Sequence, residues 1–266
     1  PARASEHSYD LRLGNWSVRE SAGKHVLRAT MGDDLIFEAS LTPQKPAALN
    51  GHEGVGVSFK DEGEASRHFS FTRMSAEGRI TWHGETERFT GSAWMDREFG
   101  TWRTMEKQKG WDWFSVQLGT GAEVMVYHLR DKEGRPSPFS SGTYVDAAGA
   151  WTHLAREDFS LEVMARWQSP HTGAVYPSGW RLRVPRHGLD LEVTPVLKDQ
   201  ELDTRGTTMI VYWEGACVVR GRHGNELTEG RAYVELVGYD RSHEQPSLSA
   251  FLFGESLDRR WRSIFG

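Results

Sequence analysis

Hydrophobic and polar residues alternate with a period of two along many short segments of this chain, a pattern typical of half-buried β-strands. In WRLRVP, Trp180, Leu182 and Val184 fall on one face, while Arg181 and Arg183 fall on the other. The same alternation occurs in LDLEVTPV at 189–196, in SLEVMARW at 160–167 and in DLIFEASL at 34–41. These segments predict a chain built mainly from antiparallel strands.

Turn signals interrupt the predicted strands at intervals of roughly ten residues. They lie at 131–138, 147–149, 187–188 and 222–225. The spacing predicts about eight or nine strands between Gly110 and Tyr239 and about five or six before residue 104, as in barrels or sandwiches. We therefore expect two tandem β domains, residues 1–104 and 105–266. The segment 42–54 is expected to be a loop, and residues 255–266, with Ser256 as N-cap, a short helix.

The composition predicts a soluble protein that is rich in aromatic residues. Eleven Trp, twelve Phe and seven Tyr among 266 residues place much of the apolar volume in rings, which suit strands and ligand cavities. The net charge of −5 gives no electrostatic footprint for nucleic acid, and no apolar run is long enough to span a bilayer. The single cysteine, Cys217, excludes an internal disulfide, and its neighbours Ala216 and Val218 predict a buried, inert thiol.

Two motifs place acids beside tryptophans in predicted strands. In WMDREFG the alternation puts Trp94, Asp96 and Glu98 on one face, and in GWDWFS it puts Asp112 with Phe114. A carboxyl group in apolar surroundings resists ionisation, so these acids are candidate proton donors. The alternative is structural: the acids lie outside and pair with basic groups, or accept backbone hydrogen bonds at a strand end.

A third motif, YWEG, places Glu214 on the same face as Tyr212. Glu235 lies between Tyr233 and Val237, on a face that is predicted to continue to Tyr239. Structural pairing of either acid with an arginine, Arg73 or Arg231, is the alternative to a catalytic role. The run 199–201 is expected to be a polar turn.

Several familiar chemistries have no motif in this chain. It contains no GxSxG, no GxxxxGK[ST] and no HExxH, and its eleven histidines have no ligand-like spacing. We therefore expect neither a metal nor a cofactor. His68 and His83 lie on strand-like runs beside aromatic residues and are the histidines expected to face a pocket.

Taken together, the motifs resemble the AttH-like or hydroxyneurosporene synthase (carotenoid 1,2-hydratase)-type family of bacterial proteins. The resemblance runs from about Asp10 to Tyr239 and rests on GSAWMDREFG, GWDWFSVQL, EVMVYHLRD, SSGTYVD, SPHTGAVYPSGWRL, DQEL, YWEGACVVRG and YVELVGY. It implies two tandem lipocalin-like β-barrels. Members usually carry a further upstream segment, so the resemblance also implies that the first barrel lacks its N-terminal strands here. A missing N-terminal fragment or a partner chain would then complete it.

The resemblance implies hydration of an isolated carbon–carbon double bond or cyclisation of a polyene. Our first hypothesis is a hydro-lyase that protonates an apolar isoprenoid or polyene in an aromatic-lined cavity. Asp96 or Asp112 would be the acid, with Glu214 orienting water. Glu98 is a further catalytic candidate, and the candidates for substrate contact are Trp94, Trp111, Trp113, Tyr212, His68 and Arg73.

Two other functions stay open at this point. A lipocalin-like carrier would bind a lipid or isoprenoid without transforming it, and a pericyclase would rely on cavity shape and hydrogen bonds. The family resemblance favours the bacterial periplasm or secretion over the cytoplasm, and the sequence leaves the compartment open.

Overall fold

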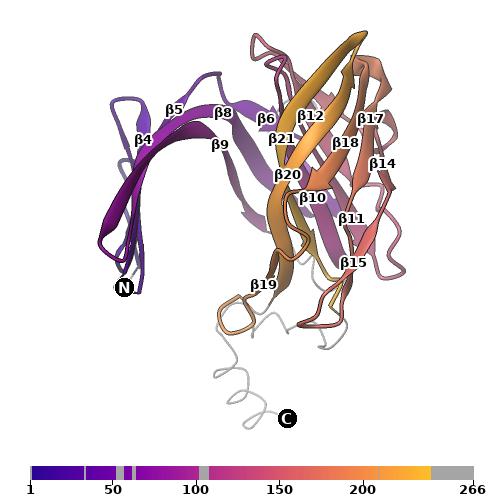
Figure 1. Ribbon diagram of the computed structural model, residues 1–266. Helices are drawn as coiled ribbons and strands as arrows, with labels where there is room; N and C mark the ends of the chain where they lie inside the picture. Colours follow the sequence, from indigo (N-terminus) through magenta and orange to yellow (C-terminus); the bar gives the residue numbers. More distant parts are fainter. Residues whose placement is uncertain are drawn as a thin grey trace. The chain divides into compact units, whose positions relative to one another are not determined.

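The chain is all-β, and its strands form two curled antiparallel sheets, as the alternation predicts (Figure 1). The computed structural model describes residues 2–32, 34–51, 57–61, 64–101, 108–208 and 210–240, with only the backbone described for 57–61, 64 and 101. Within these ranges the helical segments are two short 3-10 turns, and no helix is long and apolar enough to cross a bilayer. The predicted C-terminal helix at 255–266 lies outside the described residues.

The chain divides into two compact units that do not follow a single cut in the sequence. The first unit contains Pro1–Ala48 and Ser70–Asp96, and the second contains Leu49–Phe69 and Arg97–Gly266. The long strands β8 (Glu64–Trp82) and β9 (Glu85–Thr101) therefore contribute to both units.

The first sheet has nine strands in the described part of the chain, in the order β1-β2-β3-β4-β5-β8-β6, with β7 and β9 also paired to β8. Its other strands are β1 (Ala2–Ala4), β2 (Asp10–Leu13), β3 (Trp16–Ser21), β4 (Lys24–Met31), β5 (Leu35–Pro43), β6 (Ala48–Asn50) and β7 (Val57–Asp61). The prediction of five or six strands was too low because β1 and β6 are too short to display an alternation. Strand β6 also lies within the segment that we expected to be a loop.

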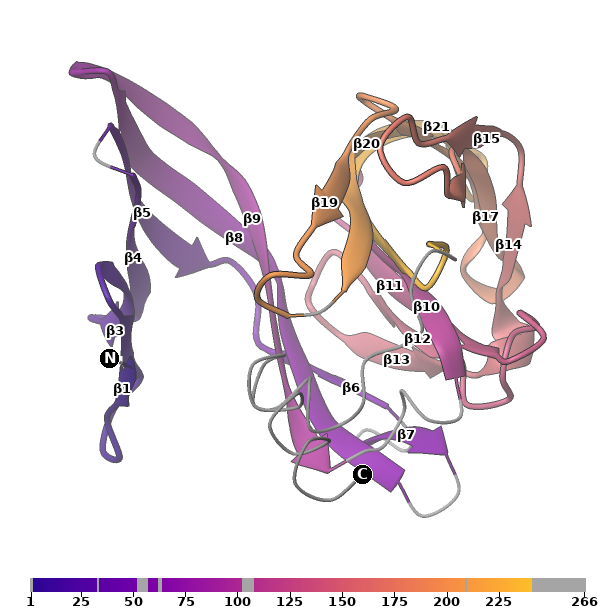
Figure 2. The ribbon, with the colours of Figure 1, turned by 90° about the horizontal axis from the view of Figure 1, so that it is seen from below.

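The second sheet has ten strands in the described residues, in the order β13-β12-β11-β10-β21-β20-β18-β17-β14, with β19 paired to β20. They are β10 (Gln108–Leu118), β11 (Glu123–Asp131), β12 (Ser141–Val145), β13 (Trp151–Leu154), β14 (Ser160–Val163), β17 (Trp180–Val184), β18 (Leu189–Pro195), β19 (Glu201–Asp203), β20 (Val211–His223) and β21 (Glu226–Val237). A separate ribbon pairs β15 (Arg166–Gln168) with β16 (Val175–Pro177). Figure 2 shows these strands curling round a common interior.

That interior is packed with side chains. Phe114 meets Trp180 edge to face, with ring centroids 5.3 Å apart, and Trp180 lies 6.0 Å from Trp213. Trp180, Leu182 and Val184 join the same buried cluster, as predicted for WRLRVP. The predicted strand SLEVMARW instead divides between β14 and β15, and its Val163 is exposed. Cys217 is buried there as expected, and burial raises the pKa of its thiol to about 12.

His128 is a buried titratable group within this interior. The residue is 7% exposed, and its ring stacks on Phe159 with centroids 5.3 Å apart. Burial lowers the pKa of His128 to about 4, and the nearby charges of Arg156 and Arg130 act in the same direction. The histidine is therefore neutral in the folded protein and takes up a proton more readily when the chain unfolds.

This pKa difference predicts a pH-dependent stability. Because the unfolded chain binds the proton below about pH 6.5, the contribution of His128 is complete above that pH and is lost as the pH falls towards 4, by about 3 kcal/mol. Urea unfolding of wild type and His128→Phe at several pH values between 7.5 and 4 measures it. The wild type should lose more stability than the variant, and parallel pH curves would contradict the assignment.

Candidate functional site

The second sheet carries a row of acidic and aromatic side chains on the face that points away from the packed interior. In β10, Asp112 and Phe114 belong to the inner set, so Trp111 and Trp113 belong to the outer one. The register places Trp113 opposite both Tyr127 of β11 and Glu235 of β21. It also places Glu235 opposite Glu214 of β20, so one row crosses four adjacent strands (Figure 1). We call this the aromatic–acidic face: Trp111, Trp113, Tyr127, Tyr212, Glu214, Tyr233 and Glu235.

The two glutamates of this face have different surroundings. The indole Nε1 of Trp111 donates a hydrogen bond to Oε1 of Glu235 at 2.6 Å. Glu214 is half-buried, and this burial raises its pKa. Glu235 therefore has a donor suited to the carboxylate, while the environment of Glu214 favours the neutral acid.

The tyrosines next to the pair remain neutral over the physiological range. Burial raises the pKa of Tyr212, and the charge of Glu235 adds to this. Burial also raises the pKa of Tyr233 to about 12, with Glu214 and Glu235 acting in the same direction. Tyr127 is buried, and its hydroxyl accepts a hydrogen bond from Ser141 Oγ at 2.8 Å. The face thus offers uncharged phenol and indole rings around two carboxyl groups.

Asp112 lies on the other face of the same sheet, at one end of the packed interior. The Nε of Arg130 is 3.1 Å from its Oδ1, and the Tyr239 hydroxyl is 3.0 Å from both carboxylate oxygens. The Arg130 guanidinium also lies 4.0 Å from the centroid of the Tyr239 ring. Burial raises the pKa of Asp112, whereas Arg130 and Tyr239 oppose this shift. The structure therefore does not bring Asp112 together with Glu214.

The position of Tyr239 corrects the prediction that the outer face continues from Val237 to this residue. Gly238 adopts a φ of +81°, which breaks the alternation and lets the Tyr239 side chain reach Asp112 on the inner side. A Cβ at Gly238 would lie 1.9 Å from the carbonyl oxygen of Lys109, so only glycine fits.

The acids of the WMDREFG motif lie on β9. Trp94 Nε1 donates to Oδ1 of Asp96 at 2.7 Å, in agreement with the predicted shared face, and Ser70 Oγ also donates to Asp96. Glu98 accepts a hydrogen bond from Ser66 Oγ. Both carboxylates are exposed; Asp96 belongs to the first unit and Glu98 to the second.

The remaining candidates occupy β8 and its turn. His68 is buried on the same face of β8 as Ser66 and Ser70, whereas Arg73 is half-buried on the opposite face. His83 does not lie on a strand: it occupies the turn between β8 and β9, has a φ of +49° and a side chain that is 66% exposed. The expectation that His83 faces a pocket was therefore wrong.

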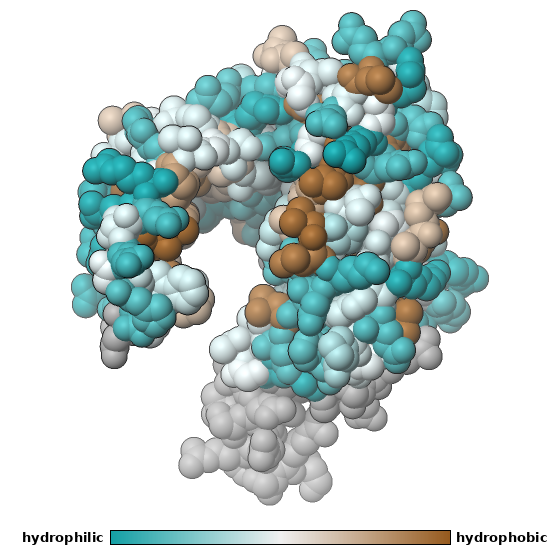
Figure 3. Space-filling model, viewed as in Figure 1, coloured by the Kyte–Doolittle hydropathy of each residue, from teal (hydrophilic) through white to brown (hydrophobic). Residues whose placement is uncertain are grey.

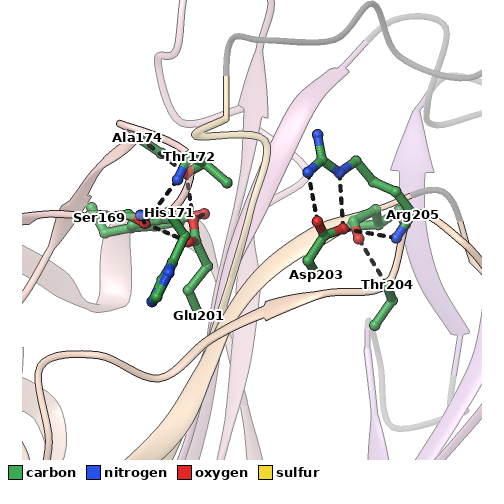
Figure 4. Close-up of polar contacts among 10 residues, drawn as sticks. Ser169, His171, Thr172, Ala174, Glu201, Asp203, Thr204 and Arg205 are labelled. Atoms are coloured by element: carbon green, nitrogen blue, oxygen red, sulfur yellow. Dashed lines mark hydrogen bonds and ion pairs between the residues drawn. The ribbon is translucent and has the colours of Figure 1, made fainter.

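Sequence reasoning treated Glu201 as part of a polar turn, but it is the acceptor of a hydroxyl cluster in the second unit (Figure 4). Two hydroxyls donate to its Oε1: Thr172 Oγ1 at 2.6 Å and the hydroxyl of the buried Tyr176 at 2.9 Å. Ser169 Oγ donates to its Oε2. His171 Nε2 lies 2.8 Å from Asp199 beside this cluster. These bonds attach the β15–β16 ribbon to β19. The signal was available in the neighbouring motifs SPHTGAVYPSGW and DQEL, whose polar residues meet in space.

Exposed apolar side chains lie next to β19 and β20, among them Val196, Leu197 and Leu202, and Figure 3 shows hydrophobic residues on this side. In the part of the chain that the structure describes, no three His, Cys, Asp or Glu side chains are arranged to hold a metal ion.

Comparison with protein-family models decides the family. The model described as AttH-like matches residues 1–239. The chain belongs to the AttH-like family. A search of the curated proteins gives no match.

Solved structures agree with this AttH-like assignment. A Nitrosomonas europaea protein assigned as AttH is 30% identical with a TM-score of 0.78, over 86% of this chain and 70% of that one. Kievitone hydratase from Nectria haematococca is 20% identical with a TM-score of 0.71, over the same shares of 86% and 70%. CghA is 10% identical with a TM-score of 0.56, over 91% of this chain and 74% of that one. At these identities, the last two show the fold alone.

The buried ion pair of the AttH-like chain predicts a strong energetic coupling. The side chains of Arg130 and Asp112 are 7% and 14% exposed, so removing one partner leaves the other charge buried and uncompensated. We expect Arg130→Met and Asp112→Asn each to lower the free energy of unfolding by about 3 kcal/mol. The double variant should lose clearly less than the sum. Urea unfolding of all four proteins measures the coupling, and additive losses would show that the pair is not coupled.

The Glu201 cluster predicts that loss of its charge lowers the protection of nearby backbone amides from hydrogen exchange. Glu201→Gln keeps the size of the side chain but removes the charge that strengthens the three hydroxyl bonds, at a cost of about 2 kcal/mol. Hydrogen exchange should accelerate in residues 166–177 of the β15–β16 ribbon. Asp203→Asn, at the exposed acid two residues along β19, is the control. Unchanged exchange in the Glu201→Gln variant would mean that other contacts hold the ribbon.

Proposed function

We propose that this AttH-like chain is a hydratase-type enzyme that adds water to a carbon–carbon double bond of an apolar isoprenoid or polyene. The observation that carries the proposal is the half-buried Glu214, whose pKa is raised by burial on the aromatic–acidic face. Family membership supports it at a coarse level, and the fold shared with kievitone hydratase is compatible with it.

Hydration of an isolated alkene needs a carboxylic acid that still holds its proton near neutral pH. Of the acids in the aromatic motifs, Glu214 fits this need best. Asp112 is already engaged by Arg130 and Tyr239 in a packed interior, and Asp96 is exposed and accepts two hydrogen bonds. We therefore assign proton donation to Glu214 and not the water-orienting role that the sequence suggested.

The rings on the same face suit the charge that develops next. Protonation of an alkene leaves a carbocation, which the faces of indole and phenol rings stabilise by roughly 1–2 kcal/mol per contact when water is excluded. Trp111, Trp113 and Tyr212 are half-buried around Glu214 and Glu235 and are the proposed walls for this cation. Water then adds to the cation and gives the alcohol.

Substitution of the acid tests this function. Purified protein is incubated with candidate polyenes in heavy water, and products are analysed by mass spectrometry. Hydration should add water and place one solvent-derived deuterium on carbon. Glu214→Gln should lower the rate by about 10²–10⁴-fold. Glu229→Gln, at an exposed acid on neighbouring β21, is the matched control and should retain the rate.

Other outcomes would redirect the assignment. A new ring of unchanged mass would indicate a pericyclase, and a retained but unaltered ligand would indicate a carrier. Full activity of Glu214→Gln together with loss of activity in Asp96→Asn would transfer the role of acid to Asp96.

A further inference from the structure

The two acids of the aromatic–acidic face are direct cross-strand neighbours. Glu214 of β20 and Glu235 of β21 oppose each other in an unbroken antiparallel register that runs from Tyr212 to His223. Directly opposed residues on one face have Cβ atoms roughly 4.5–5.5 Å apart, and like charges at this distance are unfavourable. Full ionisation of both carboxyls at this half-buried position is therefore costly, and a single retained proton relieves the repulsion.

The surroundings of the two carboxyls are unequal, which decides where that proton resides. Trp111 reaches from β10 and donates its indole N–H to Glu235 at 2.6 Å. A donor of this kind stabilises a carboxylate more than a neutral acid. In the described part of the chain no indole donates to Glu214, and burial shifts its proton affinity in the direction of the acid.

Other titratable groups of the described residues also lie on this face, among them Glu229 of β21, which pairs with Arg220 of β20. The phenols of Tyr212 and Tyr233 flank the pair on its own strands, and Tyr127 lies one strand beyond Trp113. Phenols are neutral donors near pH 7. The cation on the same face of β21, Arg231, lies four residues from Glu235. On β19 the residue opposite Tyr212 is the apolar Leu202.

We propose that Glu214 and Glu235 share one proton and act as an acid–base pair, with Trp111 as the positioning residue that keeps the negative charge on Glu235. This inference rests on the proposed function and assigns a role to a second carboxyl and to an indole. In the resting protein Glu214 is the acid and Glu235 the carboxylate.

The pair balances the reaction without any further reagent. Glu214 gives its proton to one alkene carbon, forming a C–H bond and leaving a cation on the other carbon. Water forms the new C–O bond, and Glu235 takes the proton that the water releases. Transfer of this proton from Glu235 to Glu214 restores the starting state, so alkene and water give the alcohol.

Carbon-13 NMR of glutamate carboxyl groups tests the pair without substrate. Spectra of Glu214→Gln and Glu235→Gln assign the two signals in the wild-type protein. At pH 7 the wild type should show Glu214 protonated and Glu235 ionised. Glu235→Gln should release Glu214 to ionise at lower pH, and Trp111→Phe should bring the two signals closer together because the charge is no longer held on one carboxyl. Glu229→Gln should change neither signal.

Activity then tests the roles of the pair. Glu235→Gln should lower the rate of hydration by about 10²-fold or more, and Trp111→Phe should shift the pH profile of the rate as well as its maximum. Two carboxyls that are both ionised at pH 7 and indifferent to each other's removal would overturn the pair, even if Glu214→Gln is inactive. A shared proton in a protein that hydrates no alkene would instead leave the pair standing and refute the proposed function.

Discussion

The packed interior of the second sheet is the constraint on which the rest of this structure depends. Phe114, Trp180 and Trp213 interlock there, and the strands that carry them cannot shift by one residue without turning these rings to the opposite face. The same register sets the outer face. Because Trp213 must point inward, Glu214 must point outward, and the pairing of β20 with β21 then places it opposite Glu235.

Polar groups at one end of this interior hold segments that are distant in sequence. Asp112 of β10, Arg130 of β11 and Tyr239 after β21 form one contact group, and the Tyr239 ring lies 5.4 Å from that of Tyr176. Tyr176 in turn donates to Glu201. Buried charges of this kind are stable only when each is paired, so the group defines a specific arrangement of the ribbon and the last strand.

The acids on the two faces of the second sheet have different surroundings, and this difference bears on function. The acid on the inner face, Asp112, contacts Arg130 and Tyr239, which hold it in place. On the outer face, Glu214 and Glu235 oppose each other, and aromatic rings lie on the same face. A proton donor needs a charge state that changes during the reaction, and the environment of Glu214 favours such a change more than that of Asp112. For the second unit, the outer face of the sheet is therefore the better candidate for chemistry than its packed interior.

The sequence by itself determined many of the longer strands and their faces, since the alternation of apolar and polar residues is local and is enforced by burial. It placed Trp180 and Leu182 inside, Asp112 with Phe114, and Trp94 with Asp96, and its motifs indicated the family. Only the tertiary structure decided which strand faces which. The opposition of Glu214 and Glu235, the bond from Trp111, the inward turn of Tyr239 after Gly238 and the hydroxyls on Glu201 all depend on register and backbone conformation. These join residues far apart in the chain, and a period-two pattern carries no information about such pairings.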